Sequence, residues 1–166
     1  MKIDLAAATV TPKEIKVSLP PEAIDVSPDA EIVANVDFNG TVWRDPRGAH
    51  ISGHLSTAVK AECVRCLEPA EKRIEVEFDD LFVEELEAGS GEIEVAAGSL
   101  DESVAGDAVE LAEVLREQIL LELPDQPLCR EDCKGLCPKC GQNRNLIDCN
   151  CSAEIDPRWA ALRDLN

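Results

Sequence analysis

The chain has 166 residues, 45% of them hydrophobic and 3% aromatic, and carries a formal net charge of −18 at pH 7. The hydrophobic content excludes a wholly disordered chain, and the length suffices for one domain with an aliphatic core. The acidic balance argues against binding to nucleic acid by bulk charge, because phosphate binding relies on clustered Lys and Arg.

The first twenty residues, MKIDLAAATVTPKEIKVSLP, carry charges throughout and contain no apolar run of signal-peptide length. No later stretch approaches the roughly 18 apolar residues of a membrane-spanning helix. We therefore expect a cytoplasmic protein with no membrane partner, in which cysteine thiols stay reduced. Within this segment, residues 15–19 are the best candidate for a first strand.

Three further segments alternate apolar and polar residues with a period of two, as half-buried strands do: residues 32–42, 50–63 and 72–78. Short connections between them predict an antiparallel meander with one solvent-facing side. In the middle strand, Gly53 is expected to mark a bulge, and the inward set is Ile51, Leu55, Thr57, Val59, Ala61 and Cys63.

Both histidines, His50 and His54, are expected at the surface of the middle strand, about 13 Å apart and too far from each other to share an ion. The connection that follows this strand reads CVRCLEP. Cys63 and Cys66 are therefore expected at the tip of a hairpin, not in a core.

Residues 87–106 are rich in Gly, Ser and acid and predict a loop with a short strand at 93–95. Asp107 is expected to cap a helix over 108–122, with Glu110 as its capping-box partner. The apolar stripe of this helix is Leu111, Val114, Leu115 and Ile119, and Pro124 ends it. A last short helix over 157–165 is expected to pack Trp159 and Leu162.

Most of the negative charge lies in the middle of the chain. Residues 75–122 carry sixteen acidic side chains against one basic one, Arg116, which is a net charge of −15. Such a segment suits a basic protein partner better than RNA, although acidic surfaces also simply keep proteins soluble.

Eight cysteines form four close pairs: Cys63/Cys66, Cys129/Cys133, Cys137/Cys140 and Cys149/Cys151. Zn²⁺ binds four thiolates in a tetrahedron, and two-residue spacings let both thiolates of a turn reach one ion. In CPKCG, Pro138 fixes the turn and Gly141 accepts a left-handed conformation. Four pairs therefore predict two structural zinc sites of four cysteines each, whose closed shells leave no position for catalysis.

The spacing favours Cys137/Cys140 with Cys149/Cys151 in a local ribbon, which leaves Cys63/Cys66 for Cys129/Cys133. The competing arrangement joins Cys129/Cys133 to Cys137/Cys140 and Cys63/Cys66 to Cys149/Cys151, and a single zinc with spare thiols is a further alternative. Disulfides, a thioredoxin-type redox site and an iron–sulfur cluster are each less favoured than zinc. The chain has no P-loop, no GxSxG and no dinucleotide fingerprint, and we expect no enzymatic activity.

The strand ending in CVRCLEP, the acidic middle, the helix ending ILLELPDQPLC, then EDCKGLCPKCGQNRN and CNC, resemble the YceD family of large ribosomal RNA subunit accumulation proteins. The resemblance covers roughly residues 15–165 and implies a cytoplasmic, non-enzymatic factor for accumulation of 23S ribosomal RNA and ribosome assembly. It also implies that all eight cysteines are the recurring positions. The family's gene neighbour suggests ribosomal protein L32 as a partner.

We therefore predict an α+β fold, mainly antiparallel sheet with one principal helix and a C-terminal cysteine-rich zinc ribbon. Residues 1–128 form the sheet and helix core and 129–166 the ribbon with a short helix, packed as one domain. The partner is a basic ribosomal protein or large-subunit RNA, the latter reached through Arg65, Lys134, Lys139 and Arg144. The alternative function is a zinc-stabilised nucleic-acid-binding module.

Overall fold

The computed structural model describes residues 1–28, 30–84, 102–104, 108–151 and 158. Its strands and helices follow one another along the chain as β1 (Lys2–Asp4), β2 (Lys13–Leu19), a 3-10 turn (Pro21–Ala23), β3 (Glu31–Ile32), β4 (Val36–Arg44), β5 (Ala49–Glu62), β6 (Pro69–Glu84), β7 (Glu102–Val104), β8 (Ala108–Glu110) and α1 (Leu111–Glu122). Among the described residues, no helix has the length and hydropathy needed to cross a membrane.

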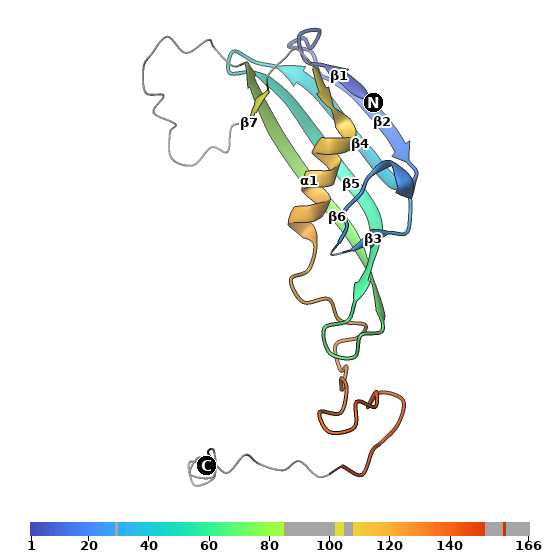
Figure 1. Cartoon of the computed structure of the whole chain (residues 1–166). Coiled ribbons are helices and arrows are strands. Elements are labelled where there is room, and N and C mark those ends of the chain that lie inside the picture. The colour runs from blue at the N-terminus through green and yellow to red at the C-terminus, as the bar shows by residue number, and fades with distance from the viewer. Residues whose placement is uncertain (29, 85–101, 105–107, 152–157, 159–166) are drawn as a thin grey trace.

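The main sheet runs in the order β2-β4-β5-β6-β7, with β3 paired to the end of β5 (Figure 1). All pairs in it are antiparallel except β6 with β7. The predicted meander and the strand at 15–19 are confirmed. The strand predicted at 32–42 is instead split into β3 and β4, because the chain between them bends: Val33 N–H donates to the Ala58 carbonyl, and the Thr57 hydroxyl donates to the Ala34 carbonyl.

One face of the sheet carries the core, and α1 lies across that face (Figure 1). The predicted apolar stripe is confirmed, since the buried residues of α1 are Leu111, Val114, Leu115 and Ile119. They meet Phe38, Ile51 and Leu55 from β4 and β5, each at most 2% exposed. A side chain of this size contributes about 1.5–3 kcal/mol when fully buried, so the helix is held by its stripe more than by its intrinsic propensity.

Gly40 and Gly53 face each other across β4 and β5, and no bulge interrupts the register at Gly53. The prediction of a bulge there was wrong. A Cβ on Gly53 would lie 2.6 Å from the Asn39 carbonyl oxygen and 2.9 Å from the ring of Phe38. The two glycines instead make room for the ring of Phe38, which stacks on Phe78 with ring centroids 5.6 Å apart.

The helix begins three residues later than the sequence predicts. Residues 108–110 pair with β1 as β8, and the Leu111 N–H donates to the Met1 carbonyl. Glu110 makes no capping bond to the helix and binds the Met1 ammonium at 3.0 Å instead. Pairing with β1 thus overrides the capping-box pattern. Asp107, the strand predicted at 93–95 and the helix predicted at 157–165 lie outside the described residues.

His50 faces the predicted side of β5 but is buried, at 5% exposure, which corrects its placement at the surface. Trp43 lies opposite it on β4 and stacks on its ring, with centroids 4.1 Å apart and planes 6° apart. The His50 Nδ1 lies 3.1 Å from an Asp79 carboxylate oxygen. A cross-strand aromatic partner therefore shields one histidine, while His54 is exposed as expected.

Candidate metal centres

The cysteines lie at and beyond the tip of the β5–β6 hairpin, at the end of the molecule away from β1 and β8 (Figure 1). Cys63 and Cys66 form the turn of that hairpin, as predicted. Their expected place outside any core was wrong, because both are buried in a small cluster with Ala70 and Cys133. All eight cysteines are free thiols, and their sulfur atoms gather in two groups, within each of which every sulfur lies within 4.8 Å of the others. The first cluster is Cys63, Cys66, Cys129 and Cys133, and the second is Cys137, Cys140, Cys149 and Cys151. This is the grouping that the spacing favoured.

The sulfur positions of the first cluster fit a tetrahedral ion. Zinc–thiolate bonds of about 2.3 Å place the sulfurs of a tetrahedron about 3.8 Å apart. The Sγ atoms of Cys63 and Cys133 are 3.8 Å apart, and those of Cys66 and Cys129 are 3.5 Å apart. Three of the four residues are buried, and Cys129 is exposed. These distances far exceed a disulfide bond of about 2.05 Å, so the arrangement suits a shared cation.

Both CxxC turns share one backbone frame. In the first, Cys63 N–H donates to the Glu68 carbonyl and Leu67 N–H donates to the Cys63 carbonyl, both at 2.9 Å. In the second, Cys137 N–H donates to the Gln142 carbonyl at 2.8 Å and Gly141 N–H donates to the Cys137 carbonyl at 2.9 Å. The residue after each second cysteine is left-handed, with φ of 61° at Leu67 and 71° at Gly141. Sequence predicted this conformation for Gly141 and missed it for Leu67.

Arg65, inside the first CxxC, fastens the later cysteines to the hairpin. Its guanidinium Nη1 donates to the Cys133 carbonyl at 3.0 Å, and its own carbonyl accepts from Leu136 N–H at 2.9 Å. Gly135 passes close to it with φ of 70°, and a Cβ there would lie 2.9 Å from the Arg65 carbonyl oxygen. A glycine is therefore required between the two halves of the CREDCKGLCPKC stretch.

Asn145 joins the two clusters and was not singled out from the sequence. Its side-chain Nδ2 donates to the Cys133 Sγ at 3.3 Å, and its Oδ1 accepts from Lys134 N–H at 2.8 Å. The hydrogen bond from the Asn145 side chain, together with one from the Gly135 N–H, lowers the pKa of the Cys133 thiol below its ordinary value. Asn145 comes from the segment between Cys140 and Cys149 of the second cluster, so no spacing rule would have paired it with the first.

Backbone N–H groups lower the pKa of the first thiol in each CxxC. The Cys129 N–H holds the pKa of Cys63 at about 6, and the Cys140 and Lys139 N–H groups hold that of Cys137 at about 6. Burial, with bonding to neighbouring thiols, raises the pKa of Cys129 to about 12, and bonding to Cys140 raises that of Cys151 to about 12. A cation bound by all four thiolates must displace protons from each cluster.

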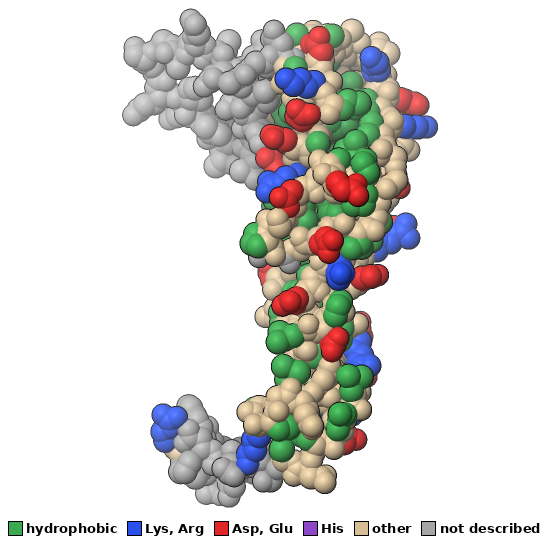
Figure 2. Space-filling model, turned by 45° about the vertical axis from the view of Figure 1, so that its right-hand side comes forward, with side chains coloured by type: hydrophobic (Ala, Val, Ile, Leu, Met, Phe, Trp, Pro, Cys, Tyr) green, Lys and Arg blue, Asp and Glu red, His purple; other side chains and the backbone are tan. Residues whose placement is uncertain are grey.

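The second cluster is more open than the first. Cys137 is buried and Cys149 is half-buried, whereas Cys140 and Cys151 are exposed. Leu146 and Ile147, between its two halves, are 76% and 54% exposed. Figure 2 shows hydrophobic side chains, a colour class that includes cysteine, at the surface of this end of the molecule.

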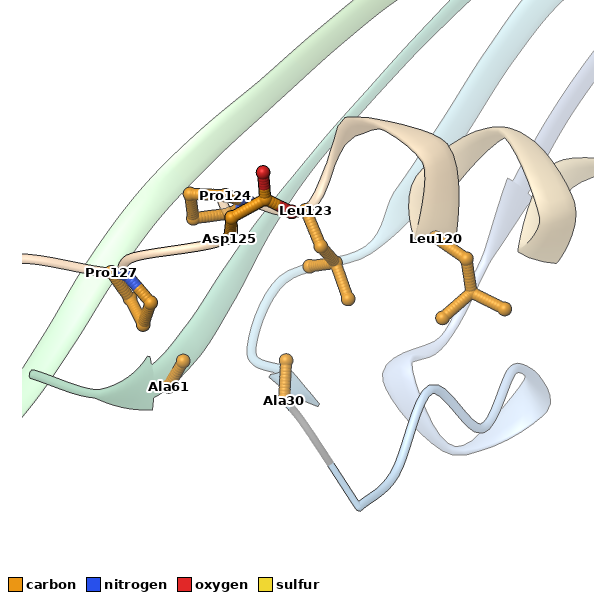
Figure 3. A pocket seen from close by; sticks show the side chains of 7 residues that line it. All are labelled: Ala30, Ala61, Leu120, Leu123, Pro124, Asp125 and Pro127. Atoms are coloured by element: carbon orange, nitrogen blue, oxygen red, sulfur yellow. The ribbon is translucent and has the colours of Figure 1, made fainter. Parts of the chain in front are cut away.

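A groove of about 440 Å³ lies between the end of α1, the segment leading to the cysteines and the end of β5 (Figure 3). Six of its seven lining residues are apolar, Ala30, Ala61, Leu120, Leu123, Pro124 and Pro127, and Asp125 is the only polar one. Catalytic pockets bring several polar groups together, and this groove does not.

The profile described as "Large ribosomal RNA subunit accumulation protein YceD" matches residues 51–166. An uncharacterized protein of Mycobacterium tuberculosis is 32% identical over 132 residues, which cover 80% of this chain and 62% of the relative. One of Mycobacterium leprae is 30% identical over 115 residues, 69% of this chain and 52% of the relative.

A maize relative, named as a chloroplastic homolog 1 of the YCED large ribosomal RNA subunit accumulation protein, is 26% identical over 155 residues, 78% of this chain and 52% of its own length. The chain thus spans between about half and 62% of these relatives. No solved structure is significantly similar to it.

The matched region begins in β5 and takes in the hairpin tip, α1 and both cysteine clusters, which is well over half of the chain. The family is named for the accumulation of a ribosomal RNA subunit and not for a catalysed reaction. On this match the chain belongs to the YceD family of large ribosomal RNA subunit accumulation proteins.

Proposed function

We propose that this protein is a non-enzymatic, cytoplasmic factor for accumulation of 23S ribosomal RNA and assembly of the large ribosomal subunit. The observation that carries the proposal is the family match across residues 51–166. The clusters agree with it, because thiolate sets that leave no open position serve architecture and not catalysis. The function then lies in the surfaces that the clusters hold in place.

The partner we favour is a basic ribosomal protein, with L32 as the first candidate because of the family resemblance. The support is electrostatic. Residues 75–122 carry a net charge of −15, and the described part of this segment includes the exposed carboxylates Glu75, Glu77 and Asp79 on β6. A field of this sign attracts cationic partners and repels the phosphates of RNA.

The second candidate is a nucleic-acid-binding module at the cysteine-rich end. The exposed Leu146 and Ile147 favour an interface there, with Lys134, Lys139 and Arg144 as its cations. Arg65, expected to join them, donates from its guanidinium to the carbonyls of Cys133 and Glu131. Its structural role weakens the case for RNA at this surface.

We also propose that each cluster holds one Zn²⁺, the first through Cys63, Cys66, Cys129 and Cys133 and the second through Cys137, Cys140, Cys149 and Cys151. The fit of the sulfur distances to a tetrahedron supports zinc at the first cluster. Metal analysis of the purified protein is expected to give two zinc ions per chain and no thiols that react before unfolding. Iron, a single zinc or reactive thiols would each contradict this assignment.

The function is tested in the source organism by removing the gene and measuring 23S relative to 16S ribosomal RNA. We expect 23S to fall and to recover when the chain is restored. Capture of the tagged protein at near-physiological salt, with and without ribonuclease, identifies the partner. We expect a basic ribosomal protein that remains after ribonuclease treatment, and retention of RNA without any ribosomal protein would favour the second candidate.

A further inference from the structure

Within the described part of the chain, the long strand β6 has no pairing partner along most of its outer edge. From Pro69 to Leu81 it pairs with β5 on one side, and β7 pairs with its other side only from Phe82 to Glu84. Among the described residues, no strand lies along the edge from 69 to 81 (Figure 1). An edge strand presents every second N–H and C=O outward, which is a template for another strand. Beyond Pro69, this edge contains no proline to block pairing.

The opposite edge of the sheet is built differently. There β2 is only seven residues long and carries Lys13 and Lys16, and short length and lysines are common ways to protect an edge from pairing. The edge of β6 is longer and has its cations, Lys72 and Arg73, only near its start. Beyond them it carries carboxylates on its solvent-facing side at alternate positions, Glu75, Glu77 and Asp79. Their neighbours across β5 are Ser56, His54 and Ser52, so no Lys or Arg lies directly opposite them.

These carboxylates decide what can pair with the edge. A second copy of the chain, paired edge to edge, would bring two rows of carboxylates together, and like charges opposite each other destabilise a sheet. RNA offers no backbone amides for the ladder and is repelled by the same charges. An extended protein segment with Lys or Arg at alternate positions satisfies both the backbone groups and the carboxylates.

A groove beside the edge is lined mostly by charged side chains, with Ile74 as its apolar residue. This groove of about 240 Å³, lined by Lys72, Arg73, Ile74, Glu75 and Glu122, lies between β6 and the end of α1. Arg73 binds Glu75 at 2.7 Å and His50 Nδ1 lies 3.1 Å from an Asp79 carboxylate oxygen, so these two carboxylates already have partners. Glu77, between them, therefore carries most of the attraction. Residues of an added strand that alternate with its basic ones would face this groove.

We propose that the outer edge of β6, from Glu71 to Leu81, docks an extended segment of a basic protein partner, which adds to the sheet as a further strand. Its basic side chains alternate along the solvent-facing side, opposite Glu75, Glu77 and Asp79. The inference rests on the proposed function, because it specifies how a basic ribosomal protein is bound. The affinity comes from the backbone ladder and the selectivity from the alternating charges.

The test uses the full chain and three synthetic peptides of one composition. The first, TKVKVKVT, alternates lysine and valine. The second, TVVKKKVT, has the same residues with its lysines adjacent. The third is the first peptide with N-methyl groups on alternate backbone amides. It keeps the lysine charges and loses the backbone N–H donors at the methylated positions. Binding is followed by fluorescence anisotropy, and hydrogen exchange reports on the amides of β6.

We expect the alternating peptide to bind at least tenfold more tightly than either of the other two and to slow exchange of the β6 amides. Glu77→Lys is expected to weaken its binding at least tenfold, whereas Asp37→Lys, an equal charge change on the exposed side of β4, changes it less than twofold. Equal binding of the N-methylated peptide, or no change in β6 exchange, would overturn the docking edge.

Failure of this inference is separable from failure of the proposed function. In cells that lack the gene, wild-type protein is expected to restore 23S ribosomal RNA and the variant Glu75→Lys/Glu77→Lys is expected not to, at equal protein levels. Full restoration by that variant overturns the docking edge and leaves the proposed function intact. If wild type itself leaves 23S unchanged, the proposed function fails, and the peptide experiment alone then decides the edge.

Discussion

The two cysteine clusters begin from the same turn and end in different surroundings. Each CxxC turn closes through the same two backbone hydrogen bonds, and in each the residue after the second cysteine has a left-handed backbone. The first cluster joins the β5–β6 hairpin to residues 129–133, with three of its four cysteines buried. The second joins residues 137–140 to residues 149–151, with only one buried. The same local turn can therefore connect segments that are distant in the sequence or close a single short segment.

The difference lies in the length of chain that each cluster closes. A cross-link between distant residues removes more freedom from the unfolded chain than one between near residues. Cys66 and Cys129 are separated by β6 and α1, whereas Cys140 and Cys149 are separated by one short loop. We therefore expect the first cluster to govern global stability and the second to govern local order.

The largest expected effect is from loss of a ligand at the first cluster. With zinc at both sites, Cys63→Ser is expected to release one zinc and to lower the melting temperature by roughly 10–20 °C, since structural zinc contributes several kcal/mol and each kcal/mol shifts it by about 2–4 °C. Cys140→Ser is the matched variant at the second cluster. It should also release one zinc and shift melting by less than about 4 °C, as measured by calorimetry and metal analysis.

Equal destabilisation by the two cysteine variants would show that the two clusters contribute equally to global stability. The far-ultraviolet circular dichroism of each variant provides the control. The sheet signal should persist with Cys140→Ser and decline with Cys63→Ser at the same temperature.

The pH dependence of metal binding is the next largest effect. Protons compete with metal for the thiolates, so affinity falls as the pH is lowered, about tenfold per pH unit for each proton displaced. Above pH 6 the protons come from thiols with a raised pKa, such as Cys129 and Cys151 at about 12. Below about pH 6, Cys63 and Cys137 are protonated as well, and the slope is expected to steepen at both clusters.

Competition with a chelator between pH 5 and pH 8 measures that slope. An unchanged slope through pH 6 would contradict the lowered pKa of the two leading thiols. Because backbone N–H groups hold the pKa of both Cys63 and Cys137 at about 6, the break is expected at a similar pH for both metals.

Asn145→Ala is expected to weaken metal binding at the first cluster by about 10–100-fold, the usual range for partners of metal ligands, and to leave the second unchanged. The amide is lost from the Cys133 sulfur. Asn145→Asp keeps the acceptor for Lys134 N–H and removes the donor, so it separates the two roles. Asn39→Ala, on the exposed side of β4, is the control. Metal transfer to a chelator measures all three, and equal loss at both clusters would contradict the assignment.

The smallest effects are expected from substituting the two residues with a left-handed backbone, Leu67 and Gly141. A left-handed backbone costs a residue with a side chain roughly 1–2 kcal/mol, which glycine avoids. Gly141→Leu is expected to destabilise the second turn by about that amount. Leu67→Gly is expected to be neutral or to stabilise the first by up to about 1 kcal/mol, because greater freedom of the unfolded chain offsets part of the gain. Urea unfolding and metal transfer measure both, and a destabilising Leu67→Gly would contradict the argument from φ.

The sequence predicted the features that depend on period and spacing. Alternation located the three long strands, the helical stripe located the buried face of α1, and the gaps between cysteines favoured the observed grouping of thiols. The features that it missed depend on partners distant in the sequence. His50 is buried because Trp43 stacks on it, and α1 begins late because β1 pairs with residues 108–110.

The same limit applies at the clusters. The cysteines could be counted from the sequence, but the amide that acts on Cys133 comes from Asn145, in another turn. Leu67 adopts a conformation that its residue type disfavours, because the hydrogen bonds of Cys63 close the turn around it. Neither the amide nor the conformation has a local pattern that a single sequence displays.

The facing glycines Gly40 and Gly53 also make a genetic tool available. A methyl group at either position would clash with backbone atoms of the facing strand and with the ring of Phe38, and so would strain the sheet without changing any solvent-facing residue. An allele such as Gly53→Ala is therefore a rational source of temperature-sensitive strains. Shifting such a strain to the restrictive temperature is expected to deplete the folded protein and so to time the role proposed for it in assembly of the large ribosomal subunit.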